Sequence, residues 1–162
     1  MTTFTRNSAT PKTYAAAKDA ITLLKADHQV VSGLFEDYEK TDSGKKKKAL
    51  VAEICTKLSV HTQIEEEIFY PAVKAALKDQ LMVLEEMIEH GSIKELIAQL
   101  EGLEPDGEMY DAKVHVLSEY VEHHVKEEHA EMFPKAKTTS LDLVKLGAQM
   151  SARKADLLAA RG

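Results

Sequence analysis

The chain has 162 residues, of which 44% are hydrophobic and 30% are charged, and it carries a formal net charge of -6. This length and balance are typical of one globular domain with a core of its own. The negative charge argues against a general role in nucleic-acid binding, because contacts to phosphates need a basic surface. No segment approaches the roughly 18 consecutive apolar residues of a membrane-spanning helix, so we expect no role in a membrane.

Two features of the sequence favour a cytoplasmic protein. Cys55 is the only cysteine, so no disulfide can form within the chain. Residues 1–12 are polar and lack the apolar segment of a secretory signal peptide. We therefore expect a reducing environment.

In chain order, the sequence predicts a flexible lead-in followed by long amphipathic helices. Residues 1–13 are rich in Thr and Ser and form the lead-in. Apolar residues then recur at steps of three and four, which is the period of an α-helix. This pattern covers about residues 14–40, a second segment from Leu50 to Pro71 and a turn or two beyond, residues 83–100, and a fourth segment from Val114 that we expect to stop at Pro134.

Short loops separate these helices, which predicts antiparallel neighbours. After Pro134, residues 138–140 are candidates to cap a shorter helix from about Leu141 to Ala160. The predicted fold is all-α: an up-and-down antiparallel four-helix bundle over residues 14–137, with an additional C-terminal helix packed on it in residues 138–162.

Each of the four long helices has one histidine inside its apolar stripe. These residues are His28, His61, His90 and His124. The intervals of 33, 29 and 34 residues each correspond to about one helix and one loop, so all four can lie at one level of an up-and-down bundle. The sequence therefore predicts a single site.

Two of these histidines are followed four residues later by a carboxylate, in the pairs His61/Glu65 and His124/Glu128. A step of four returns to nearly the same face of a helix, so both glutamates are expected to face the core. Glu127 lies about 60° from His124 around the helix and remains a second candidate. The other histidines, His115, His123 and His129, are expected at the surface or behind the ligands.

Buried carboxylates and imidazoles are costly unless they are paired, and a metal satisfies both. Bridging carboxylates with imidazoles favour a redox-active pair such as iron or manganese, and two irons are the preferred interpretation. A metal-free interaction module is the alternative, in which the same residues would be buried without compensation.

These residues lie in motifs that resemble a known family. The quoted segments are Ala26-Asp27-His28, His61-Thr62-Gln63-Ile64-Glu65 with Phe69-Tyr70-Pro71, Glu89-His90, and His124-Val125-Lys126-Glu127-Glu128 with Phe133-Pro134. Over about residues 21–137 the chain is similar to the bacterial hemerythrin-like (HHE cation-binding) domains. The resemblance implies two iron ions with an oxo or hydroxo bridge, and these ligands: His28, His61, Glu65, His90, His124 and Glu128.

The sequence departs from oxygen-carrying hemerythrin in the third helix. That protein has two histidines four residues apart, whereas here Lys94 follows His90 by four residues and Glu86 precedes it by four. Glu86, Tyr120 and Glu127 are candidates to complete the ligand set.

Two functions follow as hypotheses. The first is a binding or sensing protein for dioxygen, peroxide or nitric oxide in oxidative stress, which would need a separate protein partner for signalling. The second is a di-iron enzyme that consumes peroxide, as a catalase does, or oxygen. A ferritin-like oxidase is disfavoured, because that class places Glu three residues before His and no such motif occurs here.

Overall fold

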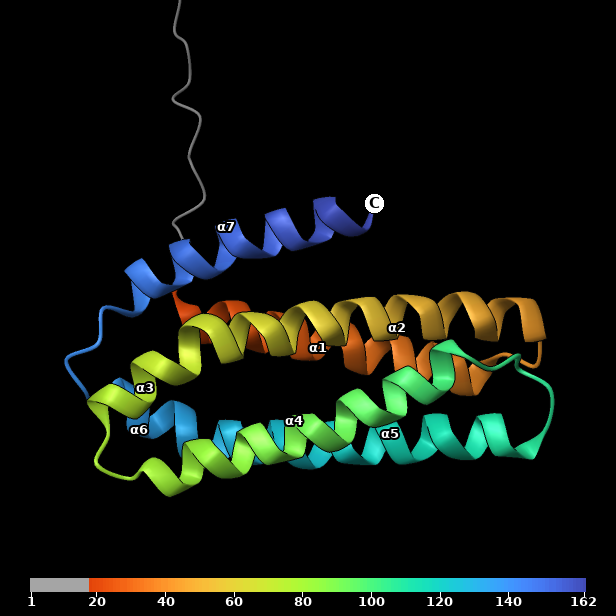
Figure 1. The fold of residues 1–162 in the computed structure, drawn as a ribbon, viewed down its shortest axis with the longest axis horizontal. Coiled ribbons are helices and arrows are strands. Elements are labelled where there is room, and N and C mark those ends of the chain that lie inside the picture. Colours follow the sequence, from red (N-terminus) through yellow and green to blue (C-terminus); the bar gives the residue numbers. More distant parts are fainter. Residues whose placement is uncertain (1–17) are drawn as a thin grey trace, which may run out of the picture.

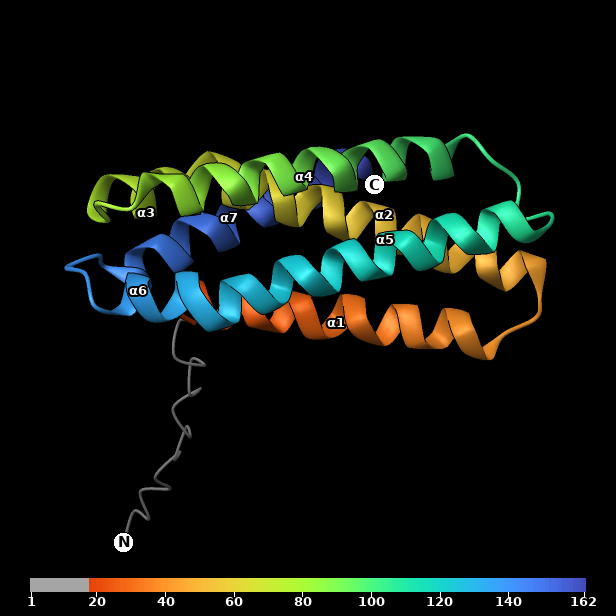
Figure 2. The same ribbon diagram turned by 90° about the horizontal axis from the view of Figure 1, so that it is seen from below.

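The computed structural model describes residues 18–162, and the expected lead-in at residues 1–13 lies outside this part. Four long helices form the bundle: α1 (Ala20–Lys40), α2 (Gly44–Ile64), α4 (Gln80–Glu101) and α5 (Glu108–Glu127). Helix α1 packs beside α2 and α4 packs beside α5, and the two pairs lie on each other (Figures 1 and 2). The prediction of an all-α up-and-down bundle is confirmed for the described residues.

Side-chain caps determine where α1 and α2 begin. Asp19 accepts a hydrogen bond from the Thr22 amide at 2.7 Å, so α1 begins at Ala20. The predicted start near Tyr14 is wrong for Lys18 and Asp19, which are not helical, and residues 14–17 lie outside the described part. Ser43 caps α2 in the same way.

The prediction that the fourth helix stops at Pro134 is wrong. A π-helical turn, η2 (Glu128–Met132), follows α5 and leads into α6 (Phe133–Lys137). The second helix repeats this arrangement with η1 (Glu65–Phe69) and α3 (Tyr70–Ala76), where Pro71 takes the same place. A proline ring crowds the carbonyl four residues earlier in an α-helix, and the wider turn before each proline relieves this crowding.

The predicted C-terminal helix is present as α7 (Leu143–Arg161), which lies across α1 and α2 outside the bundle (Figure 1). Asp142, and not residues 138–140, caps it by accepting a hydrogen bond from the Lys145 amide at 3.0 Å. The buried Met150 on α7 joins the core cluster that contains Phe69 and Phe133.

The apolar core has two parts. One cluster surrounds Phe69, Tyr70 and Phe133 at the end of the bundle that carries α3 and α6. The other surrounds Ile54, Ile97 and Leu117 toward the opposite end. In α1, α2 and α4 the histidine of the stripe lies between residues of the two clusters, and His124 of α5 lies between Val121 of the second cluster and Met132 of the first, in η2. A polar layer therefore divides the core.

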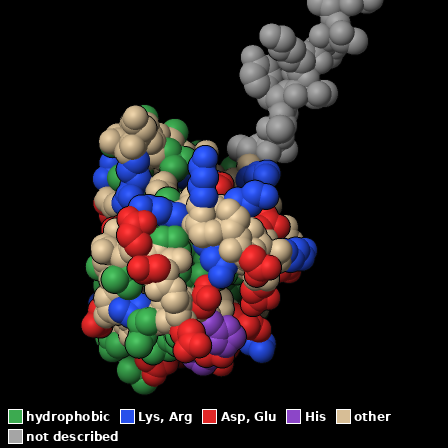
Figure 3. Space-filling model, turned by 90° about the vertical axis from the view of Figure 1, so that its right-hand side faces the viewer, with side chains coloured by type: hydrophobic (Ala, Val, Ile, Leu, Met, Phe, Trp, Pro, Cys, Tyr) green, Lys and Arg blue, Asp and Glu red, His purple; other side chains and the backbone are tan. Residues whose placement is uncertain are grey.

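The outer surface carries charges of both signs. At the end of the bundle where α1 connects to α2 and α4 connects to α5, acidic and basic side chains intermingle (Figure 3). Among the described residues, no helix combines the length and apolar character needed to cross a membrane.

Candidate metal centre

The polar layer between the two core clusters contains six buried side chains from four helices and both π turns. Their exposed fractions range from 0% to 8%, and His28 is the most exposed of them. The structure thereby brings together every residue of the predicted set: His28, His61, Glu65, His90, His124 and Glu128.

The first half of the layer is formed by His28 on α1 and His61 on α2. Their Nε2 atoms lie 3.2 Å apart. The Nε2 of His28 is 3.4 Å from Glu128 Oε1, and the Nε2 of His61 is 2.9 Å from Glu65 Oε1. Each histidine thus faces one of the two glutamates.

The second half is formed by His90 on α4 and His124 on α5, whose Nε2 atoms lie 3.0 Å apart. The Nε2 of His90 is 3.4 Å from Glu65 Oε1, and the Nε2 of His124 is 3.1 Å from Glu128 Oε1. Glu65 and Glu128 therefore each contact one histidine of each half.

The outer nitrogens of two histidines hydrogen-bond to carboxylates. The Nδ1 of His61 lies 3.1 Å from Asp27 Oδ2. The Nδ1 of His124 lies 2.5 Å from Glu86 Oε2 and 3.1 Å from Glu89 Oε2. A carboxylate can only accept from a neutral imidazole, so Nδ1 carries the proton and the lone pair of Nε2 points inward.

This arrangement requires positive charge at its centre. The carboxylate oxygens of Glu65 and Glu128 are buried and have no hydrogen-bond partner. Lone pairs of facing imidazoles repel one another at 3.0 to 3.2 Å. Metal–ligand bonds of about 2.1 Å at right angles place neighbouring ligand atoms about 3.0 Å apart. The donor set and its spacing therefore fit bound metal.

The pKa values also indicate that the centre needs positive charge. Burial alone would lower the pKa of His61, but the charge of Glu65 and the hydrogen bond to Asp27 raise it to about 10. For Glu65, burial would raise the pKa, whereas the charge of His61 holds it well below its usual range. Protons can thus supply the positive charge that metals would supply, and the two compete.

The three candidates for completing the ligand set have different positions. Glu86 is buried, and burial raises the pKa of its carboxyl group to about 7, although the hydrogen bond with His124 lowers it. It occupies the inner face of α4, while the neighbouring Met87 is 41% exposed. Tyr120 is 45% exposed, and Glu127 pairs with His123 at the surface.

Tyr70 reaches the centre instead. The sequence placed it in the segment Phe69-Tyr70-Pro71 but did not predict it as a ligand. Its hydroxyl lies 3.1 Å from the Nε2 of His90 and 3.2 Å from that of His124, and the side chain is 1% exposed. At about 100° per residue, Tyr70 would face away from His61. The π turn shifts the register by about one residue and turns Tyr70 inward. In the sequence, the nearby Pro71 was the feature that could have indicated this π turn.

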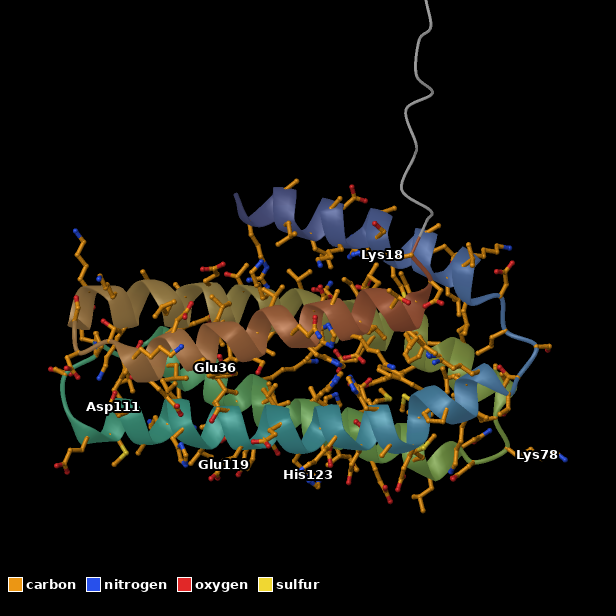
Figure 4. All side chains as sticks on the ribbon, turned by 180° about the vertical axis from the view of Figure 1, so that it is seen from behind. Lys18, Glu36, Lys78, Asp111, Glu119 and His123 are labelled. Atoms are coloured by element: carbon orange, nitrogen blue, oxygen red, sulfur yellow. The ribbon has the colours of Figure 1, made fainter. Side chains whose placement is uncertain are left out.

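The remaining histidines lie outside this layer. His115 pairs with Glu119, and His123 points away from the bundle (Figure 4). The Nε2 of His129 lies 2.9 Å from the Nδ1 of His28 and so stands behind a predicted ligand.

A groove between α1 and α5 leads toward His28. Its volume is about 290 Å³, and Ser32, Glu36 and Glu122 line it together with Val121 and Val125. Glu36 lies between the two helices in Figure 4. His28, Val121 and Val125 also line a small cavity of about 10 Å³ beside the histidines. The groove and this cavity therefore share one wall next to the polar layer.

Comparisons with known proteins agree with this geometry. The family model of the hemerythrin HHE cation binding domain matches residues 19–136. The uncharacterized protein Rv2633c of Mycobacterium tuberculosis is 27% identical over 139 residues, which cover 83% of this chain and 84% of that protein. A crystal structure of a hemerythrin HHE domain-containing protein from Mycobacterium kansasii, a homolog of Rv2633c, has a TM-score of 0.76 and 25% identity, covering 88% of this chain and 89% of the other.

A longer protein is also similar. A Nostoc protein named DNA nickase is 25% identical over 111 residues, which cover 68% of this chain. The matched part is 31% of the Nostoc protein, so this chain spans about a third of its length.

Proposed function

The chain belongs to the family of hemerythrin HHE cation-binding domains, and from this premise we propose that it holds two iron ions and binds or senses dioxygen, peroxide or nitric oxide. His28 and His61 would hold one ion, His90 and His124 the other, with Glu65 and Glu128 shared. When bound, the iron pair supplies reversible electron transfer and positions for a small ligand.

One observation carries this proposal: facing pairs of Nε2 atoms at 3.0 and 3.2 Å beside four buried carboxylate oxygens without partners. Neutral imidazole with carboxylate is a donor set that suits iron. The side chains of Asp27, Glu86 and Glu89 orient the imidazoles. The cavity beside His28, with a volume of about 10 Å³, favours small ligands. We place this activity in the cytoplasm, where a partner protein would read the state of the centre.

The test is the metal content of the purified protein, measured together with its absorption spectrum before and after peroxide. We expect two irons per chain and absorption bands that change with oxidation. The double variant His61→Ala/His124→Ala should lose the metal, whereas His115→Ala, which changes an exposed histidine, should retain it. A protein that takes up no iron even after anaerobic reconstitution would contradict the proposal.

A second function, peroxide consumption, is favoured by Tyr70. The reaction converts two molecules of H2O2 into two of water and one of O2, so it needs no further reductant. The hydroxyl of Tyr70, 3.1 and 3.2 Å from two predicted ligand nitrogens, is placed to hydrogen-bond with a small molecule at the centre. A positioned proton donor contributes about 100-fold or more to such reactions.

Tyr70→Phe should therefore slow peroxide loss by at least about tenfold while the protein keeps its iron. Tyr120→Phe, an exposed tyrosine, provides the control. A sensor would consume only a stoichiometric amount of peroxide, and the rate would then be equal in both variants and the native protein.

A further inference from the structure

Helix α7 lies outside the four-helix bundle but is fitted closely to it. A Cβ atom added at Gly147 would lie 2.3 Å from the carbonyl oxygen of Lys18 and 2.8 Å from the amide nitrogen of Ala20. Only glycine permits this approach of α7 to the start of α1. The position of α7 along the bundle is therefore well defined.

Two neighbouring cations on α7 reach back to the bundle. Arg153 donates to both carboxylate oxygens of Glu67, at 2.8 and 3.2 Å, and Glu67 lies in the π turn η1. Lys154 donates from Nζ to Oδ1 of Asp27, while the other oxygen of Asp27 accepts from Nδ1 of His61. A continuous chain of contacts thus joins Lys154 to a predicted iron ligand.

The two halves of the centre have different surroundings. Behind His61 stands Asp27, whose charge Lys154 balances. Behind His124 stand Glu86 and Glu89, and within residues 18–162 neither pairs with a Lys or Arg. Glu89 also lies 3.3 Å from His123 and contacts Glu127. Glu66 lies 3.7 Å from the Nδ1 of His90 and pairs with Lys94.

The formal charges next to the ligands therefore differ. Around His61 and His28 there is one carboxylate and one cation, which sum to zero. Around His90 and His124 there are three carboxylates and one cation, which sum to -2 with Glu86 ionised and to -1 with Glu86 protonated. Negative charge behind an imidazole makes it a stronger donor and stabilises the higher oxidation state of its metal.

We propose that Lys154 is a positioning residue of the centre: through Asp27 and His61 it keeps the iron position of His28 and His61 less electron-rich than the position of His90 and His124. The inference rests on the proposed di-iron function. It gives α7, which lies beyond the matched family region, a role in setting the reduction potential. Anything that lifts α7 from the bundle would remove this charge and shift the potential.

The experiment is a spectroelectrochemical titration of the iron-loaded full chain, with an electrode supplying and removing electrons. Lys154→Met should shift the midpoint potential to more negative values, about a tenfold change in the ratio of oxidised to reduced protein, or 59 mV for one electron. Lys154→Arg, which keeps the charge, should restore the native value. Arg153→Met removes the neighbouring cation, whose partner Glu67 contacts no predicted ligand, and should shift the potential far less.

The outcomes separate this inference from the proposed function. Equal midpoint potentials in Lys154→Met, Arg153→Met and the native protein, with two irons in each, would overturn the role of Lys154 and leave the di-iron function standing. A native protein without iron would overturn both. If Lys154→Met loses iron while Arg153→Met and Lys154→Arg retain it, Lys154 is needed to hold the metal rather than to set its potential, and the inference is overturned. Loss of iron in both Met variants would assign the effect to the docking of α7 alone and overturn the inference.

Discussion

His61 is the residue at which protons and metal compete most directly. In the metal-free protein, Glu65 and Asp27 raise its pKa to about 10 against the effect of burial. A histidine whose pKa is higher in the folded than in the unfolded state stabilises the fold below the unfolded value of about 6.5. That contribution is lost as the pH rises toward 10.

We therefore expect the melting temperature of chelator-stripped protein to fall, by about several degrees, between pH 6.5 and 10. Metal binding should show the opposite dependence: iron displaces protons from the same nitrogens, so its affinity increases with pH over this range. Calorimetric scans of both forms across the range measure the two trends. A melting temperature of the stripped protein that stays constant would show that His61 is not protonated.

At the residue scale, the sequence predicted the six polar residues that the structure brings together, because histidine and glutamate are unusual in an apolar stripe. It did not predict the residues behind them. Asp27 lies next to His28, but its contact with His61 on another helix depends on the rotation of two helices. Lys154 is an ordinary exposed position in any pattern read along α7 alone.

Among the elements, α7 offers the sharpest test of packing. Gly147→Ala would place a methyl group within 2.3 Å of a backbone oxygen, so we expect a loss of about 1 to 3 kcal/mol in the free energy of unfolding. Gly33→Ala in α1 is the matched control, because a Cβ atom there meets nothing within 4 Å. It should stabilise the helix by up to about 1 kcal/mol.

Urea unfolding of both variants measures these changes. Equal effects of the two substitutions would mean that α7 does not hold the close position at Gly147.

The periodicity of apolar residues predicted the long helices, but it did not predict the π turns. A period of 3.6 residues is interrupted by one residue at Glu65–Phe69 and again at Glu128–Met132. Pro134 was interpreted as a helix end, and the second helix was expected to continue only a turn or two past Pro71. Each proline instead follows a π turn that accommodates its ring. The same interruption turns Tyr70 toward the centre. The period of a regular helix therefore did not predict the orientation of this side chain.

For the whole molecule, the centre connects two pairs of helices. α1 and α2 with η1 supply His28, His61 and Glu65, while α4 and α5 with η2 supply the other three predicted ligands. Metal bound between them would oppose their separation, so its binding energy would add to the stability of the fold.

Removal of iron by a chelator should accordingly lower the melting temperature by about 5 °C or more, corresponding to at least about 2 kcal/mol. Differential scanning calorimetry with and without the chelator measures this difference. In His61→Ala/His124→Ala the chelator should have no effect, and a stabilising effect of iron in that variant would place the bound metal elsewhere.

The repetition of one pattern in both halves has a consequence for the origin of the centre. Residues 20–76 and 80–137 each contain a helix with one histidine, then a helix with His-x-x-x-Glu, a π turn, an aromatic residue and a proline. A single ancestral hairpin of this kind, paired with an identical copy, would have presented the same six side chains across a twofold axis. Duplication and fusion of such a hairpin would place a metal site where neither half alone has enough ligands, and would leave the two metal positions free to diverge.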